Sequence, residues 1–158
     1  MAPTRWLSTH EQQVWRAFLT ANRMLFDAIE AQLARDSGMP HPYYEILVRL
    51  SEAPERSLRM SELADRSQSS RSRLSHAVAR LQEKGWVVRR DCPTDRRGQI
   101  AVLTDEGFEA LAAAAPGHVE CVRSALFDPL TDEQVAMLRQ ISEAVVRHLE
   151  ATCENPEG

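Results

Sequence analysis

A central segment of the 158-residue sequence gathers arginine and serine side chains, residue types that often contact the phosphates of nucleic acids. Eleven basic and five acidic residues lie between Arg56 and Arg97, so this segment carries +6 although the whole chain carries −4. The flanks are therefore acidic. Guanidinium groups form charge-assisted hydrogen bonds with phosphates, and a concentrated basic surface attracts a polyanion. The distribution predicts a contact with nucleic acid; the alternative is a solvated basic surface without a partner.

The stretch DCPTDRRGQIAVLT, residues 91–104, places two arginines beside a glycine. The runs WVVRR and IAVL on either side have the composition of β-strands, so we expect a hairpin with a long polar loop at its tip. Arginines there suit the negative potential of a narrow DNA minor groove. Asp95 lies two residues before Arg97 and can fix its guanidinium by a hydrogen bond. Asp95, Arg96 and Arg97 are candidate DNA contacts; in the alternative, the Asp95–Arg97 pair only stabilises the turn.

Residues 70–84 have the spacing of an amphipathic helix, with Leu74, Val78 and Leu81 on one face. The opposite face carries short or basic side chains, so the helix can enter a DNA major groove about 12 Å wide, where arginine reaches guanine edges or phosphates. A short helix, MSELADR, and a polar turn, SQSS, precede it. The alternative is an ordinary surface helix. The candidate DNA contacts here are Ser69, Ser70, Arg71, Arg73, Ser75, His76 and Arg80.

Enzymatic chemistry finds no support in the sequence. There is no HExxH, GxSxG or glycine-rich phosphate-binding motif, and no two of the five histidines have HxxxH spacing. The cysteines, Cys92, Cys121 and Cys153, are odd in number and widely spaced, which fits neither a disulfide framework nor a zinc motif. We therefore expect no catalytic residues, no metal site and no cofactor. A redox-responsive thiol at Cys92, which lies near arginines, is one alternative.

Longer helices on both sides must position the basic segment. The sequence STHE at residues 8–11 has capping-box spacing before an apolar stripe, which predicts a helix that ends near residue 37. A second helix is expected near Pro42 and a third after Thr104, with a kink or break at Pro116. A second capping box at residues 131–134 begins the last helix. Long amphipathic helices without a nearby partner favour packing against another subunit.

The segments SELADRSQSSRSRLSHAVARLQEKGWVVRR and DRRGQIAVLTDEG resemble the helix-turn-helix and wing of MarR-type transcriptional regulators, and the helical order at both ends extends the resemblance. It implies a mainly α-helical, α+β winged helix-turn-helix fold, with residues 40–104 as the DNA-binding lobe. Residues 1–36 and 105–158 would form the helical dimerisation region. The implied function is that of a homodimeric regulator that binds double-stranded DNA sequence-specifically, a repressor on a pseudo-palindromic operator.

Two positions depart from the family pattern. His76 stands where the family often has arginine, which can change the base preference or make it depend on pH. Trp86 stands in place of a small aliphatic residue and predicts a fuller core. The peroxide-sensing branch of the family uses a cysteine in the N-terminal helix; this chain has no cysteine before Cys92, so that mechanism is not supported.

The resemblance also implies an effector, because a small aromatic acid or a hydrophobic compound often releases family members from DNA. It would bind between the dimerisation helices and the DNA-binding lobe. Packing in the core is the alternative for each aromatic residue. A competing hypothesis for the whole chain is a protein-interaction adaptor that kept the fold without DNA binding. The candidate effector-binding residues are Trp15, Phe18, Asn22, His41 and Tyr44.

Composition is that of an ordinary globular protein, with 43% hydrophobic and 27% charged residues. No run of 18 apolar residues occurs, and the N-terminus MAPTRWLSTHEQQ has no apolar signal core. We therefore expect no membrane span and a cytoplasmic location in a bacterium or archaeon, with DNA binding placing the protein at the nucleoid.

Overall fold

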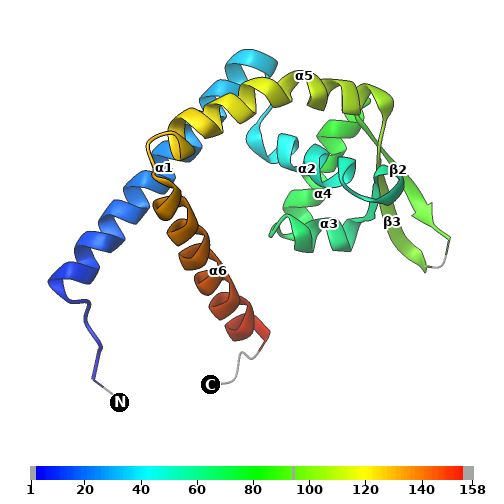
Figure 1. Cartoon of the computed structure of the whole chain (residues 1–158). Helices are drawn as coiled ribbons and strands as arrows, with labels where there is room; N and C mark the ends of the chain where they lie inside the picture. Colours follow the sequence, from blue (N-terminus) through cyan, green and yellow to red (C-terminus); the bar gives the residue numbers. More distant parts are fainter. Residues whose placement is uncertain (1–2, 94, 155–158) are drawn as a thin grey trace. The chain divides into compact units, whose positions relative to one another are not determined.

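The computed structural model describes residues 3–93 and 95–154, including the side chains of all except residues 96, 97, 153 and 154. Two compact units make up the chain, Met1–Cys121 and Val122–Gly158. The larger unit contains the long helix α1 and a lobe of shorter helices from which a β-hairpin projects (Figure 1). The smaller unit contains a π-helical turn, Arg123–Phe127, and the helix α6, Asp132–Glu154.

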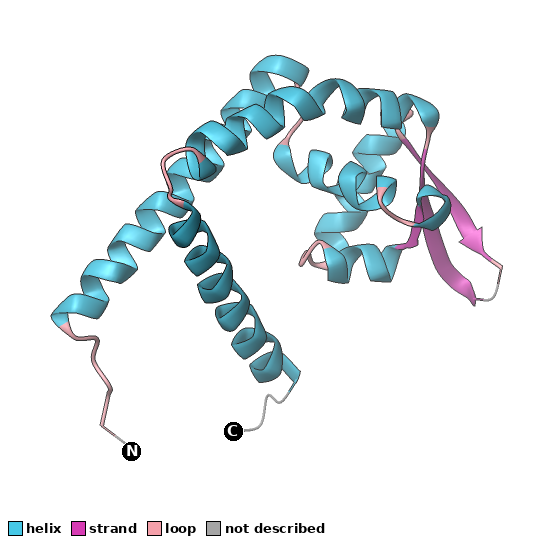
Figure 2. Ribbon diagram, viewed as in Figure 1, coloured by secondary structure: helices cyan, strands magenta, loops and turns pink. Residues whose placement is uncertain are grey.

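The larger unit is mainly helical, with a small sheet built from the hairpin and one short strand (Figure 2). This architecture confirms the predicted winged helix-turn-helix fold. Its elements in chain order are α1 (Thr9–Ser37), α2 (His41–Ser51), a 3-10 turn (Pro54–Arg56), β1 (Ser57–Arg59), α3 (Met60–Arg66), α4 (Arg71–Glu83), β2 (Val87–Cys92), β3 (Asp95–Leu103) and α5 (Asp105–Val122).

Side-chain caps begin the long helices where the sequence predicted them. Ser8 Oγ accepts a hydrogen bond from the Glu11 amide (3.2 Å), and the Glu11 carboxylate accepts one from the Ser8 amide (2.7 Å), which completes the capping box of α1. At α5, Thr104 Oγ1 accepts from the Gly107 amide (3.0 Å) and donates to the Gly85 carbonyl (2.7 Å). Thr104 therefore caps α5 and also holds it to the residues that precede the hairpin.

The core of the larger unit lies where α2, α3 and α4 pack against one another and against the sheet. Each helix turns one apolar stripe inward, so leucine and valine side chains fill the space between them. Burial of one such side chain contributes about 1.5–3 kcal/mol before entropy is counted. The largest fully buried side chains are Leu33, Met39, Leu47, Leu50, Leu63, Leu74, Val78, Leu81 and Val87.

Within the described residues, three strands form one antiparallel sheet in the order β1-β3-β2. β3 is central, and its Ala101 lies opposite Leu58 of β1 and Arg89 of β2. β1 was not predicted from the sequence. Three residues are too few for an alternating pattern, and Ser57–Arg59 is extended because it pairs with β3.

The predicted long polar loop between the hairpin strands is wrong. Strand pairing continues to Cys92 and Asp95, which leaves two residues between β2 and β3. The register shifts between Asp91, opposite Gln99, and Cys92, opposite Asp95, so the additional residues of β3 form a bulge. Asp91, Asp95 and Gln99 are exposed. Their polarity suggested a loop, but polar side chains are compatible with a solvated hairpin whose backbone groups pair with each other.

α5 continues through Pro116, so a break, one of the two predicted outcomes at this position, is wrong. Proline removes one helical hydrogen bond, but the alanine-rich sequence before it has a strong helix propensity. Gly117 then allows α1 to approach closely, because a Cβ at this position would lie only 2.8 Å from Gln32 Nε2. The Pro-Gly pair is therefore a helix-packing site, and the π-helical turn Arg123–Phe127 follows it.

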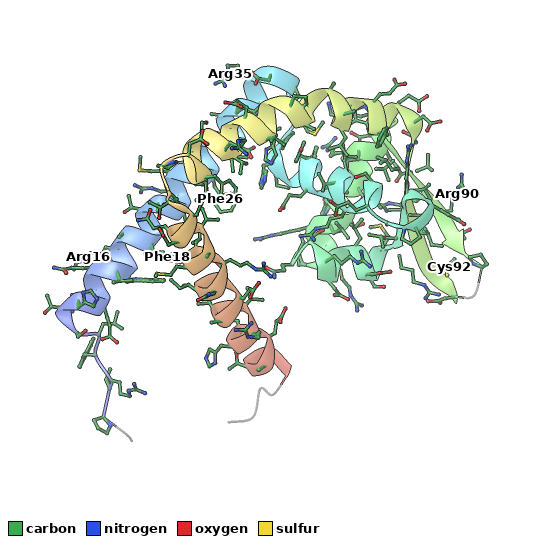
Figure 3. The ribbon with its side chains drawn as sticks, in the orientation of Figure 1. Arg16, Phe18, Phe26, Arg35, Arg90 and Cys92 are labelled. Carbon is green, nitrogen blue, oxygen red and sulfur yellow. The ribbon has the colours of Figure 1, made fainter. Side chains whose placement is uncertain are left out.

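Each unit exposes large apolar side chains along its long helix, and Phe18 and Phe26 lie on this part of α1 (Figure 3). In the smaller unit, the predicted capping box at residues 131–134 starts α6. No described helix is long and apolar enough to cross a membrane. The exposed apolar residues are Val14, Trp15, Phe18, Leu19, Met24 and Phe26 on α1, and Met137, Ile141, Val145, Val146 and Leu149 on α6.

Candidate nucleic-acid interface

The turn between α3 and α4 is short and fixed by hydrogen bonds. Ser69 donates its amide to the Ala64 carbonyl (3.0 Å), and Ser70 Oγ caps α4 by accepting from the Arg73 amide (3.3 Å). Gln68, in the same turn, has a φ of 47°, in the left-handed region that glycine occupies most easily. These contacts set the angle between the two helices, so the position of α4 on the lobe is defined.

The outward side of α4 carries most of the predicted DNA contacts. Arg71, Arg73 and His76 are exposed, and no ion pair within the described part of the chain engages them. Ser70 is exposed at the helix start, while Ser69 and Ser75 are half-buried. Short serine side chains and unpaired arginines let the helix approach a groove closely and still reach its edges. This side of the helix is therefore suited to contact with DNA.

Arg80 differs from the other predicted contacts on α4. Its Nη1 donates to Glu83 Oε2 at 2.8 Å, on an exposed surface at the C-terminal end of the helix. The hydrogen bond and the charge of Glu83 raise the pKa of the Arg80 guanidinium. A phosphate contact by Arg80 would have to compete with this carboxylate.

The hairpin formed by β2 and β3 is the wing. Gly98 is closely surrounded there, because a Cβ would lie 2.9 Å from Asp95 Oδ2 and 3.2 Å from Cys92 Cβ. Asp95 is exposed on the wing, as predicted. The side chains of Arg96 and Arg97 lie outside the described residues, and so does the predicted Asp95–Arg97 pair. Figure 3 shows Arg90 and Cys92 on the neighbouring strand β2.

A groove of about 430 Å³ separates the wing from the start of α3 and α4. It joins two predicted contacts on α4 to Asp95 on the wing and adds five residues that were not predicted. Two of these belong to β3, and the other three belong to β1 and the start of α3, whose position depends on the strand pairing that was not predicted. The lining residues are Arg59, Met60, Ser61, Arg71, Ser75, Asp95, Gly98 and Gln99.

Arg89 of β2 was also missed, because a strand arginine in a basic segment carries no distinguishing local signal. Its side chain is half-buried, and its Nη2 donates to the Ser75 carbonyl oxygen at 2.6 Å, with Ser75 Oγ 3.5 Å away. The bond links residues 14 positions apart and connects the wing directly to α4.

A second, smaller cavity of about 200 Å³ contains two of the five predicted effector-binding residues, His41 and Tyr44. His118 of α5 also lines this cavity and was not among the predicted residues. Its ring centroid lies 6.0 Å from that of His41 and 4.3 Å from that of Tyr44. Burial and the nearby His41 lower the pKa of His118, while Glu45 acts in the opposite direction. Burial raises the pKa of Tyr44.

The other three predicted effector residues lie elsewhere on α1 and do not line this cavity. Trp15 and Phe18 stack on each other with centroids 6.3 Å apart, and both are about half exposed. Asn22 donates to the Phe18 carbonyl at 2.9 Å. Their arrangement is that of an exposed helix face.

The thiol of Cys92 is buried at the wing, where the residue is 6% exposed, and Cys121 is half-buried. Burial restricts access by an oxidant, so the structure gives the Cys92 redox alternative little support. The side chain of Cys153 lies outside the described residues.

Comparison with known proteins identifies the arrangement. The sequence model of the MarR family matches residues 37–98. Sco3205, a MarR family transcriptional regulator from Streptomyces coelicolor solved in complex with DNA, is 55% identical, with a TM-score of 0.90 over 92% of each chain. AbsC, a MarR family transcriptional regulator from the same organism, is 40% identical, with a TM-score of 0.89 over 94% of this chain and 99% of AbsC.

A more distant relative leads to the same family. The transcriptional repressor MprA of Escherichia coli K12 is 26% identical over 119 residues, which span 75% of this chain and 67% of MprA. The matches to Sco3205 and AbsC cover 92% and 99% of those chains. The chain therefore belongs to the MarR family of transcriptional regulators.

Proposed function

We propose that this MarR family regulator binds double-stranded DNA by placing α4 in the major groove and the wing in an adjacent minor groove. The observation that carries the proposal is the outward side of α4, where Arg71, Arg73 and His76 are exposed and unpaired within the described residues. Arginines without intramolecular partners lose no ion pair when they contact bases or phosphates. The 55% identical Sco3205 was solved in complex with DNA, which supports DNA binding by this chain.

The groove between α4 and the wing supports a continuous contact. Arg59 and Arg71 line it together with serine and glutamine side chains, which all offer hydrogen-bond donors to a sugar-phosphate backbone. Asp95 is the acidic group in this lining. We propose that it orients a wing arginine by a hydrogen bond and does not itself contact the DNA. Ser69, Ser70 and Ser75 would bind phosphates or base edges, with Arg96 and Arg97 contacting the minor groove.

A second copy of the chain is the proposed partner for the exposed apolar helices. Trp15 and Phe18 on α1 and Ile141, Val145 and Leu149 on α6 are all more than half exposed. Surfaces of this kind are unfavourable in water and mark interfaces. A two-fold dimer would present two copies of α4, and such symmetry is matched by a pseudo-palindromic operator.

The cavity of His41, Tyr44 and His118 is the proposed effector site. It offers aromatic rings beside charged groups, including Glu45 and Arg49, and therefore suits a small aromatic acid or an apolar compound with a polar end. A compound that binds better to a conformation incompatible with the operator would release the DNA by a population shift. Repression in the cytoplasm, by binding and without catalysis, is the mode of action that we propose.

A duplex titration tests DNA binding. Fluorescein-labelled DNA from upstream of the protein's own gene is titrated with the wild type, with the double variant Arg71→Ala/Arg73→Ala, and with Arg35→Ala as a control arginine at the end of α1. The wild type should bind with an affinity that falls steeply with salt, by a log-log slope of about −0.9 for each phosphate contact. The double variant should lose at least about tenfold in affinity, while the control should be unchanged.

The adaptor hypothesis gives the opposite result. If the wild type binds no duplex even in dilute buffer, or if the double variant binds as well as the control, α4 is not a DNA-reading helix. Sedimentation of the wild type measures its molar mass and so tests whether two copies associate. A monomer at micromolar concentration would remove the basis for a pseudo-palindromic operator.

A further inference from the structure

Arg89 is an inward-facing arginine in a strand whose neighbouring side chains face out. Val88 and Arg90 are exposed, whereas Arg89 is half-buried opposite Ala101 of β3. Its guanidinium reaches α4, where Nη2 donates to the Ser75 carbonyl oxygen at 2.6 Å. Arg89 therefore joins β2 to the middle of α4.

This hydrogen bond is not needed to complete the helix. Inside an α-helix, a main-chain carbonyl ordinarily accepts from the amide four residues later, so Arg89 adds a second, charge-assisted bond to Ser75. Arg89 Nε, in contrast, is buried and has no hydrogen-bond partner within the described part of the chain. A buried donor without a partner costs stability. An apolar side chain at this inward position would avoid that cost, which indicates that arginine has a role other than stabilising the core.

The geometry indicates what that role is. Ser75 lines the groove on α4, and Asp95 and Gln99 line it on β3. Because β2 pairs with β3, the bond from Arg89 to Ser75 connects the hairpin that forms one wall of the groove to the helix that forms the other. A helix and a wing that bind different grooves of one duplex must keep a fixed distance and angle between them. If they do not, one of them contacts the wrong base pairs when the other is correctly placed. Arg89 makes such a connection, because it bonds β2 of the wing directly to α4.

We propose that Arg89 is a positioning residue of the DNA-binding surface: it holds the wing and α4 in register and thereby sets sequence specificity without contacting DNA. The inference rests on the proposed DNA-binding function. Arginine suits this position because its planar group carries several donors on a long side chain, whereas the ammonium of lysine is a point charge.

Three variants test the inference in the full-length protein. Arg89→Met keeps the length of the side chain and removes its donors, Arg89→Lys keeps the charge but not the fork, and Arg90→Met removes the same charge from the exposed face of the strand. Each is titrated with the operator duplex and with a scrambled duplex of the same length at several salt concentrations, and its melting temperature is recorded.

We expect Arg89→Met to lose at least about tenfold of the operator-to-scrambled affinity ratio, with the salt slope unchanged because no phosphate contact is removed. Arg89→Lys should lose most of the same ratio, and Arg90→Met should retain it. If Arg89→Met does not fold, Arg89→Lys decides by the same ratio.

Three results would overturn the inference. Equal losses on both duplexes, with a salt slope lower by about one, would make Arg89 a phosphate contact. A lower melting temperature with an intact ratio would make its role purely structural. A wild type that binds neither duplex would refute the proposed function itself, and the inference with it; the first two results leave that function intact.

Discussion

Replacement by alanine should destabilise the protein at Gly107 of α5 and leave its stability nearly unchanged at Gly117 of the same helix. Inside a helix this change ordinarily stabilises by about 0.5–1 kcal/mol. At Gly107, however, the new Cβ would overlap the Trp86 carbonyl oxygen and would lie 2.8 Å from Leu103 Cδ1. That carbonyl belongs to the backbone just before β2 and accepts a hydrogen bond from the Thr104 amide at 3.1 Å. It cannot move without disturbing the joint between the hairpin and α5.

We expect Gly107→Ala to lower the free energy of unfolding by about 1–3 kcal/mol, because overpacking against backbone outweighs the gain in helix propensity. At Gly117 the nearest atom is Nε2, at the end of the flexible Gln32 side chain and 2.8 Å away. Gln32 can rotate away, which breaks its 2.9 Å hydrogen bond to Asp36, a loss of about 0.5–1.5 kcal/mol. Loss and gain nearly cancel, so Gly117→Ala should change stability by less than about 1 kcal/mol.

Urea denaturation followed by far-ultraviolet circular dichroism measures both variants, at one protein concentration because association also stabilises. The midpoint of Gly107→Ala should lie clearly below that of the wild type, with Gly117→Ala close to the wild type. Gly117→Ala is the matched control, since it makes the same chemical change in the same helix. A Gly107→Ala midpoint equal to or above the wild type would refute the packing argument.

Three further predictions follow from other parts of the structure. At Gln68, where φ is 47°, Gln68→Gly should raise the free energy of unfolding by up to about 1 kcal/mol, and Gln68→Val should lower it. Urea denaturation measures both variants, and the reverse order of stability would contradict backbone strain in the turn. The half-buried Leu138 of α6 should lie in the dimer interface, so Leu138→Asp should halve the molar mass measured by light scattering, and an unchanged mass would exclude it. Because the pKa of His118 is lowered in the folded state, the unfolded state binds the proton more readily, and stability should fall as pH drops below about 6.5. His118→Phe should reduce the difference between melts at pH 7.5 and 5.5; an equal difference would show that other groups cause it.

Local interactions made much of this protein readable from its sequence. The capping box of Ser8 and Glu11 and the cap of Thr104 involve partners within three residues, and the structure contains both. The apolar stripe of residues 70–84 likewise fixed the inner face of α4, and hence the outward position of Arg71 and Arg73. The family resemblance rested on this same segment together with the wing motif.

Other features depend on chain segments that meet only after folding. β1 is a strand because it pairs with β3, and the strands of the wing extend further toward its tip than predicted because backbone pairing continues to Cys92. α5 continues through Pro116 where Gly117 packs against Gln32 of α1, a contact 85 positions away in the sequence. No pattern within a few residues contains that information.

The same distinction applies to the candidate sites. The sequence by itself determined where the helices lie, their capped starts and the basic character of α4, because periodicity and caps act between residues at most a few positions apart. Only the tertiary structure decided that Arg89 bonds to Ser75, that Arg59 joins the groove, and that His118 meets His41. The energies of these contacts depend on distances between elements that the packing of the whole lobe establishes.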